Sequence, residues 1–107
     1  MEKIKGGTDN ITDFVSQTVT IECMEPAGNP SPKQKWFFGL NPPKPLDLSN
    51  GRYSQDGWNL KITNLQKRDE GAYTCVAYND FKSRNKTMFL KAVSKLFVMF
   101  SLHKLIR

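Results

Sequence analysis

The feature that most constrains this chain is an alternating run that follows the turn signal Asp69-Glu70-Gly71. Side chains along a β-strand point to opposite faces in turn. Read as a strand, the run has one face made of Tyr73, Cys75 and Ala77 and an opposite face made of Thr74, Val76 and Tyr78. The first face has to be buried against a second layer. The chain has one other cysteine, Cys23, so a single bridge is possible.

Other short segments alternate in the same way, and turn signals separate them. We expect strands within residues 11–15, 18–23, 34–38, 52–55, 58–65 and 86–93. Asp56-Gly57 predicts a hairpin. Residues 39–51 contain several prolines and predict a connection, with at most an edge strand near Leu46 and Leu48. No segment within 11–93 keeps a helical period, so the sequence predicts an all-β domain of two facing sheets.

The chain ends differ in composition from this middle part. We expect residues 1–10 to form a flexible leader, residues 11–93 the domain, and residues 94–107 an apolar and basic tail. The first residues carry no apolar run typical of a secretion signal. The tail is too short to span a bilayer. Its alternatives are a helix at a membrane interface, a segment packed on the domain, and a non-native end.

Cys23, Trp36, Tyr73 and Cys75 occur in an order and spacing that resembles the immunoglobulin superfamily. Residues 27–32, 60–65 and 69–79 are similar to its intermediate-set (I-set) branch, found in adhesion molecules and receptor ectodomains. The resemblance covers about residues 15–92. It implies a sandwich of two antiparallel sheets, with a Cys23–Cys75 disulfide packed on a buried Trp36 and with Leu60 in the core. It also implies that the Tyr73 hydroxyl bonds to the backbone upstream.

The same resemblance implies an ion pair between Arg52 and Asp69 at the bottom of the sandwich. Ser16 and Lys82 stand where the family often has glycine, so the last hairpin is expected to differ in shape. Two alternatives stay open. The cysteines could be reduced and buried, as in an intracellular member of the fold, and Arg52 and Asp69 could be solvated charges.

The predicted strand phases turn four apolar residues outward on neighbouring strands: Phe37, Val76, Tyr78 and Phe89. An apolar surface on a solvated sheet often marks a partner site. We therefore expect a protein partner, either a second copy of the chain or another cell-surface domain. The alternatives are scattered exposed side chains and contact with a neighbouring domain.

The formal net charge of +6 suggests a second kind of partner. Five cations lie in or near two loops expected at the same end of the sandwich: Lys33, Lys35, Lys82, Arg84 and Lys86. They form a candidate site for a sulfated glycosaminoglycan such as heparan sulfate. The alternative is an ordinary solvated basic surface.

Two N-glycosylation sequons, at Asn10 and Asn85, support an extracellular or cell-surface location. Asn29 is excluded because Pro30 follows it. The alternative is a cytoplasmic structural module of a muscle filament protein. No glycine-rich phosphate loop, catalytic carboxylate pair or metal-spaced cluster occurs, and the sole histidine, His103, lies in the tail. We therefore expect a non-catalytic recognition module of an adhesion or receptor-type protein, without cofactor, metal, nucleic acid or membrane span.

Overall fold

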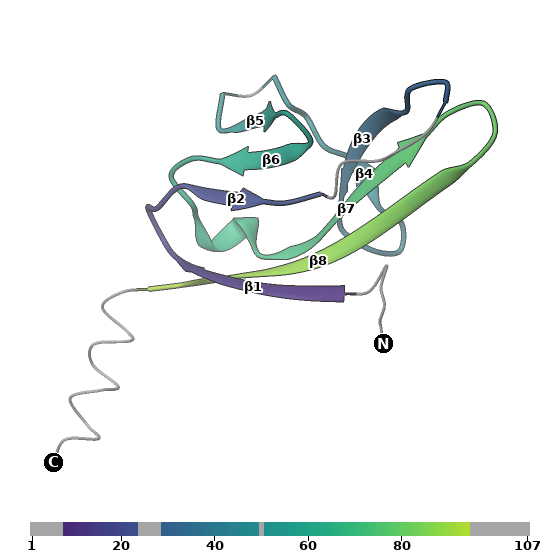
Figure 1. The fold of residues 1–107 in the computed structure, drawn as a ribbon. Helices are drawn as coiled ribbons and strands as arrows, with labels where there is room; N and C mark the ends of the chain where they lie inside the picture. The colour runs from purple at the N-terminus through teal and green to yellow at the C-terminus, as the bar shows by residue number, and fades with distance from the viewer. Residues whose placement is uncertain (1–7, 24–28, 50, 95–107) are drawn as a thin grey trace, which may run out of the picture.

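The computed structural model describes residues 8–23, 29–49 and 51–94. Within them the chain forms eight strands and one 3-10 turn (Figure 1). The strands are β1 (Thr8–Phe14), β2 (Val19–Ile21), β3 (Lys33–Phe38), β4 (Lys44–Pro45), β5 (Tyr53–Asp56), β6 (Asn59–Ile62), β7 (Gly71–Tyr78) and β8 (Ser83–Val93). The 3-10 turn, η1 (Lys67–Asp69), leads into β7. No described helix is long and apolar enough to cross a membrane.

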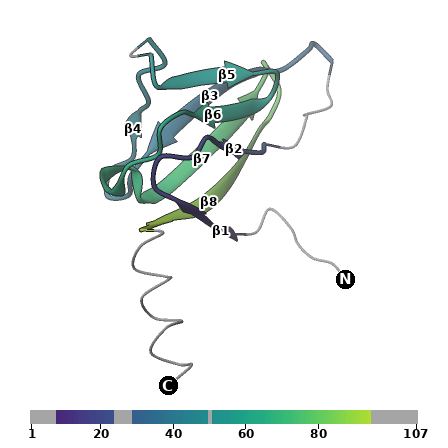
Figure 2. The ribbon, with the colours of Figure 1, turned by 90° about the vertical axis from the view of Figure 1, so that its left-hand side faces the viewer.

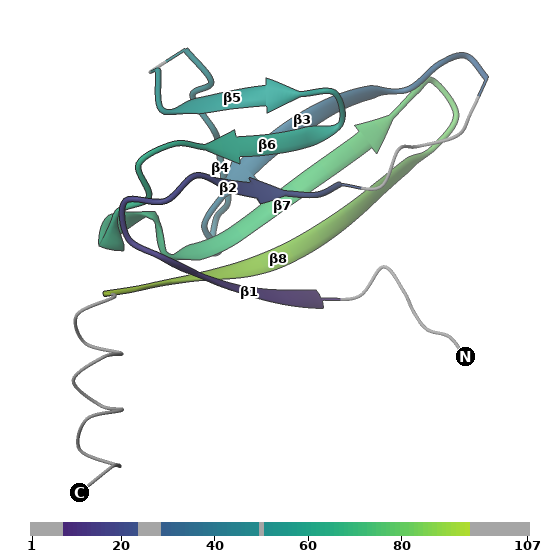
Figure 3. The ribbon, with the colours of Figure 1, turned by 60° about the vertical axis from the view of Figure 1, so that its left-hand side comes forward.

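The strands form two facing sheets, which confirms the predicted all-β sandwich. One sheet has the order β1-β8-β7-β3-β4 and the other the order β2-β6-β5. Figure 2 and Figure 3 show the smaller sheet lying across one face of the larger. All pairs of neighbouring strands are antiparallel except β1 and β8, which are parallel. No turn signal links these two strands, because they come from opposite ends of the domain, so sequence patterns did not predict their pairing.

The strand bounds differ from expectation mainly at the edges of the larger sheet. β1 begins at Thr8, so the last residues of the expected leader pair with β8. The short edge strand lies at Lys44–Pro45, just before the predicted position. Leu46 and Leu48 instead pack against the core from the connection that follows. The remaining leader and the tail from residue 95 lie outside the described residues.

The core is built around the link between the two layers. Cys23, just after β2, forms a disulfide with Cys75 on β7. Trp36 on β3 pairs directly with Cys75 and is only 3% exposed. Its indole N–H has no hydrogen-bond acceptor among the described residues. Buried residues from both sheets surround this link: Val19, Ile21, Leu60, Ile62, Leu65, Tyr73, Met88, Leu90 and Ala92. The predicted disulfide, core tryptophan and buried Leu60 are therefore confirmed.

Gly71 starts β7 at a point where no side chain fits. Its φ is +146°, and a Cβ there would lie 2.9 Å from Cζ of Phe38. Phe38 also packs edge-on against Tyr73, with ring centroids 4.8 Å apart. Glycine therefore allows β7 to enter the sheet against the Phe38 ring.

The two positions at which the family often has glycine, Ser16 and Lys82, differ in backbone conformation. Ser16 has a positive φ of 83°, the left-handed conformation that a glycine would adopt easily. The backbone φ of Lys82 is not positive. Its hairpin turns on Asn79, whose Oδ1 accepts hydrogen bonds from the backbone N–H of Phe81 and Lys82. This local side-chain bonding, typical of asparagine in turns, shapes the hairpin without a left-handed residue at Lys82.

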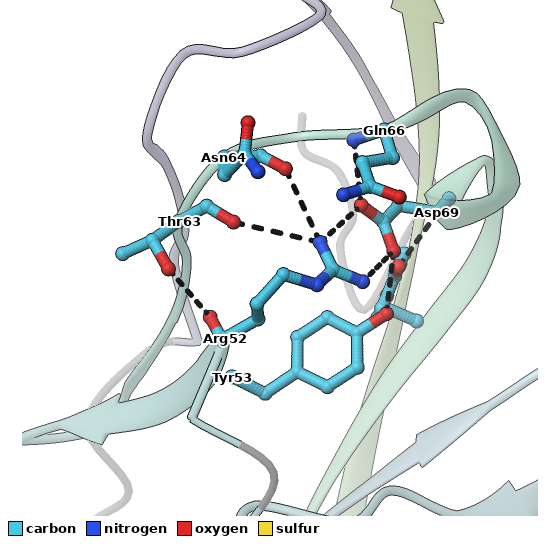
Figure 4. Close-up of polar contacts among 7 residues, drawn as sticks. Arg52, Tyr53, Thr63, Asn64, Gln66 and Asp69 are labelled. Carbon is cyan, nitrogen blue, oxygen red and sulfur yellow. Dashed lines mark hydrogen bonds and ion pairs between the residues drawn. The ribbon is translucent and has the colours of Figure 1, made fainter.

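A polar network closes the end of the sandwich below η1 (Figure 4). Arg52 binds both carboxylate oxygens of Asp69 at 2.8 and 2.9 Å. Tyr53 and the Gln66 backbone N–H also donate to that carboxylate, at 2.7 and 2.8 Å. The Tyr73 hydroxyl donates to the Asp69 carbonyl oxygen at 2.6 Å. Both the predicted ion pair and the predicted bond from Tyr73 to the upstream backbone are confirmed.

Burial and hydrogen bonding act in opposite directions on Asp69. Burial raises the pKa of its carboxyl group, but the hydrogen bonds from Arg52, Tyr53 and Gln66 outweigh burial and lower that pKa from 3.8 to about 2. The hydrogen bond to Asp69 raises the pKa of the Arg52 guanidinium. Burial raises the pKa of the Tyr73 hydroxyl, so this group stays a donor. At neutral pH the Arg52–Asp69 pair is therefore charged, and the two tyrosine hydroxyls remain neutral donors.

Replacing Tyr73 with phenylalanine should destabilise the domain by about 1 to 3 kcal/mol, because the buried Asp69 carbonyl loses its donor while the ring stays in place. Urea unfolding followed by tryptophan fluorescence measures the difference. Tyr78→Phe removes a hydroxyl from a half-buried tyrosine on the same strand and serves as control. Equal unfolding midpoints for the two variants would contradict a structural role for the Tyr73 hydroxyl.

Acid should weaken the domain through Asp69. The folded pKa of Asp69 lies below its unfolded value, so the stabilisation is present above about pH 4 and is lost as the pH falls toward 2. A shift of this size corresponds to about 2 kcal/mol in the free energy of unfolding. Urea titrations across this pH range should show the loss in the natural chain and in Asp80→Asn, an exposed loop control. Asp69→Asn should be less stable at neutral pH and should lack this loss. If Asp69→Asn lost stability with falling pH as the natural chain does, the loss would not arise from Asp69.

Candidate protein-binding face

The larger sheet has one side turned away from the smaller sheet, and we call this side the outer face. The register of β3, β7 and β8 arranges its residues in rows that cross the strands. The successive rows are Lys33–Tyr78–Ser83, Lys35–Val76–Asn85 and Phe37–Thr74–Thr87, followed by Ala72–Phe89–Asn10, in which Asn10 belongs to β1. Burial alternates along β7 from Tyr73 to Tyr78 as the sequence predicts, whereas Ala72 in the last row is also buried.

Three of the four predicted apolar residues lie together on the outer face. Val76 and Tyr78 follow one another on the outer side of β7, and Phe37 lies diagonally across from Val76 on β3. All three side chains are half-buried. The Lys35 ammonium lies 5.5 Å from the centre of the Tyr78 ring, within the range of a cation–π contact. These three residues form the apolar patch.

Phe89 lies apart from the apolar patch. It sits on β8 opposite Ala72, and its side chain is 37% exposed. The hydroxyls of Thr74 and Thr87, 2.9 Å apart, lie between it and Val76. The outer face therefore has an apolar patch on β3 and β7 and a separate phenylalanine near the β1 edge.

The outer face carries a one-sided charge. Its charged strand residues are Lys33 and Lys35 on β3 and Lys91 on β8, and all three are exposed. Among the described residues, no carboxylate occupies a strand position on the outer face. The outward strand residues of the smaller sheet are all polar, so that sheet has no comparable apolar patch on its strands: Thr20, Ser54, Asp56, Asn59 and Lys61.

Sequence reasoning missed several apolar residues near this surface. Phe81, in the β7–β8 hairpin, is 77% exposed, and Leu40, in the loop after β3, is 56% exposed. They lie at opposite ends of the sheet and do not extend the apolar patch. An apolar residue inside a polar turn sequence was the available signal for Phe81. Phe14, paired with Val93, was missed because β1 was not expected to join β8.

The predicted polyanion site is divided by the sheet. Lys33 and Lys35 belong to the outer face, whereas Arg84 and Lys86 pair with Ala77 and Cys75 and point to the opposite side. Lys82 lies in the hairpin between them. The two loops do meet at one end, because the Asn79 side-chain amide donates to the Pro30 carbonyl at 2.9 Å. The five cations thus share an end of the molecule but not a face.

Both predicted glycosylation positions lie on the outer face and are exposed. Asn85 is the direct neighbour of Val76, and Asn10 is the direct neighbour of Phe89. The threonines that complete the two sequons, Thr87 and Thr12, lie on the same side. The sequence pattern alone predicted the sequons, but their shared face depends on the β1–β8 pairing.

The described residues contain no cluster of three or more histidine, cysteine, aspartate or glutamate side chains that could hold a metal ion. The only buried carboxylate among them, Asp69, is neutralised by Arg52 at the end of the sandwich. His103 lies outside the described residues.

Comparisons with known proteins agree with this geometry. A family model described as "Immunoglobulin domain" matches residues 4–79. Roundabout homolog 4 of Mus musculus is 34% identical over 70 residues, which covers 65% of this chain and 7% of that protein. Contactin-1 of Gallus gallus is 39% identical over 73 residues, covering 68% and 7%. The striated muscle preferentially expressed protein kinase of Danio rerio is 42% identical over 66 residues, covering 61% and 2%.

Solved structures show the same fold. The N-terminal immunoglobulin module of the Drosophila receptor protein tyrosine phosphatase DLAR is 34% identical and superposes with a TM-score of 0.68, covering 81% of this chain and 42% of that one. A structure of the Down syndrome cell adhesion molecule is 26% identical with a TM-score of 0.72, covering 79% and 13%. The chain spans between 1% and 7% of the length of the curated relatives. Sequence match, fold, disulfide and buried tryptophan together show that the chain belongs to the immunoglobulin domain family.

Proposed function

We propose that this chain is an I-set recognition module of a cell-surface or secreted adhesion or receptor-type protein, and that it binds a protein through the outer face. The observation that carries the proposal is the apolar patch of Phe37, Val76 and Tyr78 on that face. Among the described residues no second layer packs on this side of the sheet. Relatives named as a receptor phosphatase and a cell adhesion molecule support this class of function.

The patch has the composition of an interface centre. Two aromatic side chains flank a valine, and lysines and threonines surround them. Protein interfaces commonly combine an apolar or aromatic centre with a polar rim. The patch residues come from two paired strands rather than from loops, so a partner would bind a rigid platform. Binding would then lose little conformational entropy.

The charge of the rim favours one kind of partner. Lys33, Lys35 and Lys91 make the outer face basic. A second copy of the chain, docked face to face, would bring lysines against lysines, and such juxtaposition is unfavourable. We therefore propose a different cell-surface domain with an acidic rim around an apolar centre. Pairing of two copies is the alternative that the experiment below detects.

Changing Val76 to aspartate should abolish binding without unfolding the domain, because Val76 lies at the centre of the patch and its side chain is turned away from the core. The measurement is binding of a multimerised form of the domain, produced without N-linked glycans, to an array of extracellular domains, together with sedimentation of the same unglycosylated domain alone. Phe37→Asp should have the same effect. Denaturant unfolding verifies that both variants remain folded.

Lys61→Glu is the matched control, because Lys61 lies on the exposed side of the smaller sheet. It should bind as the natural chain does. Self-association that disappears with Val76→Asp would show that the partner is a second copy. Binding that survives Val76→Asp and Phe37→Asp would eliminate the outer face as the recognition site.

An extracellular location is part of the proposal. The disulfide is typical of oxidising compartments, and two exposed sequons suit the secretory route. The muscle kinase among the relatives keeps the filament module as the alternative. That alternative requires reduced cysteines in the cytosol, whereas the structure has Cys23 and Cys75 bonded.

Glycosaminoglycan binding is the weaker candidate, since the sheet divides its five cations between two sides. We expect the salt concentration that elutes the domain from heparin resin to be no higher than the one that elutes it from a plain cation exchanger of equal charge density. Replacing Arg84 and Lys86 with glutamine should lower retention on both resins equally. Preferential retention on heparin that this double change removes would instead establish a sulfated-glycan site.

A further inference from the structure

We propose that Asn85 carries an N-linked glycan that covers the apolar patch, so that occupancy of this one residue decides whether the outer face is open to a protein. This inference rests on the proposed function for its consequence, but glycan attachment and coverage can be measured without any partner. It assigns to the sequon at Asn85 a role in regulation rather than in solubility alone.

The position of Asn85 carries the argument. It lies directly opposite Val76, and Val76 lies directly opposite Lys35. Side chains that face each other across antiparallel strands have Cβ atoms about 5 Å apart. The Asn85 amide nitrogen therefore belongs to the same row as the centre of the patch. A glycan on it, bulky and polar, starts within the patch rather than beside it.

Asn85 also meets the chemical needs of the modification. Its side chain is exposed, and its amide makes no hydrogen bond to another described residue. A lipid-linked oligosaccharide diphosphate is the required donor class. The bond between Nδ2 and the first sugar carbon forms as the bond from that carbon to the lipid diphosphate breaks. The amide gives up one proton, and the lipid diphosphate leaves with the electron pair.

Asn10 provides a natural comparison on the same face. It lies opposite Phe89, beyond the hydrogen-bonded Thr74 and Thr87 pair and away from Val76. A glycan on Asn10 covers the β1 edge and leaves β3 and β7 open. Two variants that each keep one glycan, Asn10→Gln and Asn85→Gln, therefore carry similar added mass but cover different parts of the outer face.

The first measurement concerns attachment. The full chain is secreted from mammalian cells behind a cleavable signal, and intact mass is compared before and after enzymatic removal of N-glycans. Asn10→Gln should keep one glycan, and the double variant should keep none. A secreted Asn10→Gln protein without any glycan overturns the proposal.

The second measurement concerns coverage and needs no partner. Lys35 lies in the Asn85 row, whereas Lys61 lies on the exposed side of the smaller sheet. Acetylation rates of both lysines are followed by mass spectrometry. Lys35 should react more slowly in Asn10→Gln than in Asn85→Gln, and Lys61 should react equally in both. Equal rates at Lys35 overturn the proposed coverage.

The third measurement concerns regulation, with the array of extracellular domains as probe. Asn85→Gln should bind, and Asn10→Gln, which keeps the Asn85 glycan, should lose binding. Equal binding of the two glycoforms would show that the Asn85 glycan does not control protein binding, even if that glycan slows acetylation of Lys35. If Lys35 is covered and neither glycoform nor the unglycosylated double variant binds, protein recognition by the outer face is wrong, while glycan coverage of Val76 stands.

Discussion

The covalent link between Cys23 and Cys75, with Trp36 paired beside it, is the constraint on which the rest of the structure depends. It joins two layers across a separation of 52 residues in the sequence. In the chain-entropy account, closing a loop of this length stabilises a domain by roughly 4 kcal/mol. Because Cys75 must point inward, its neighbours Thr74 and Val76 must point outward. The same bond that holds the core together therefore determines which residues reach the outer face.

The polar network at the end of the sandwich fixes the start of the same strand. Asp69 holds Arg52 through its carboxylate and Tyr73 through its carbonyl oxygen, so η1 and the first residues of β7 are tied to the residue just before β5. A buried pair of this kind contributes more to geometry than to net stability, because desolvation offsets much of the attraction. Gly71 also approaches Phe38 closely. This contact and the polar network together fix the register of β7 against β3.

A face with both an apolar patch and two glycosylation positions combines opposing properties. Phe37, Val76 and Tyr78 favour removal from water, whereas a glycan at Asn85 would keep water and sugar over them. The sequence does not show that the apolar patch and the glycosylation position are neighbours, because Val76 and Asn85 belong to different strands. The conflict arises from their pairing, and glycan occupancy offers a physical way to resolve it. The basic rim has the same origin, since Lys35 and Lys91 come from strands that flank β7.

Local patterns in the sequence were sufficient for the fold class and for the inward or outward phase of β3, β7 and β8, because alternation needs only neighbouring residues. The resemblance to a family supplied the Cys23–Cys75 disulfide, the buried Trp36 and the Arg52–Asp69 pair. Only the tertiary structure decided how strands lie beside one another: that β1 runs parallel to β8, that the Thr74–Thr87 pair separates Phe89 from Val76, and that the sheet divides Lys35 from Arg84. A strand's phase is a property of its own residues, but the neighbours on its face depend on register, which long-range pairing sets.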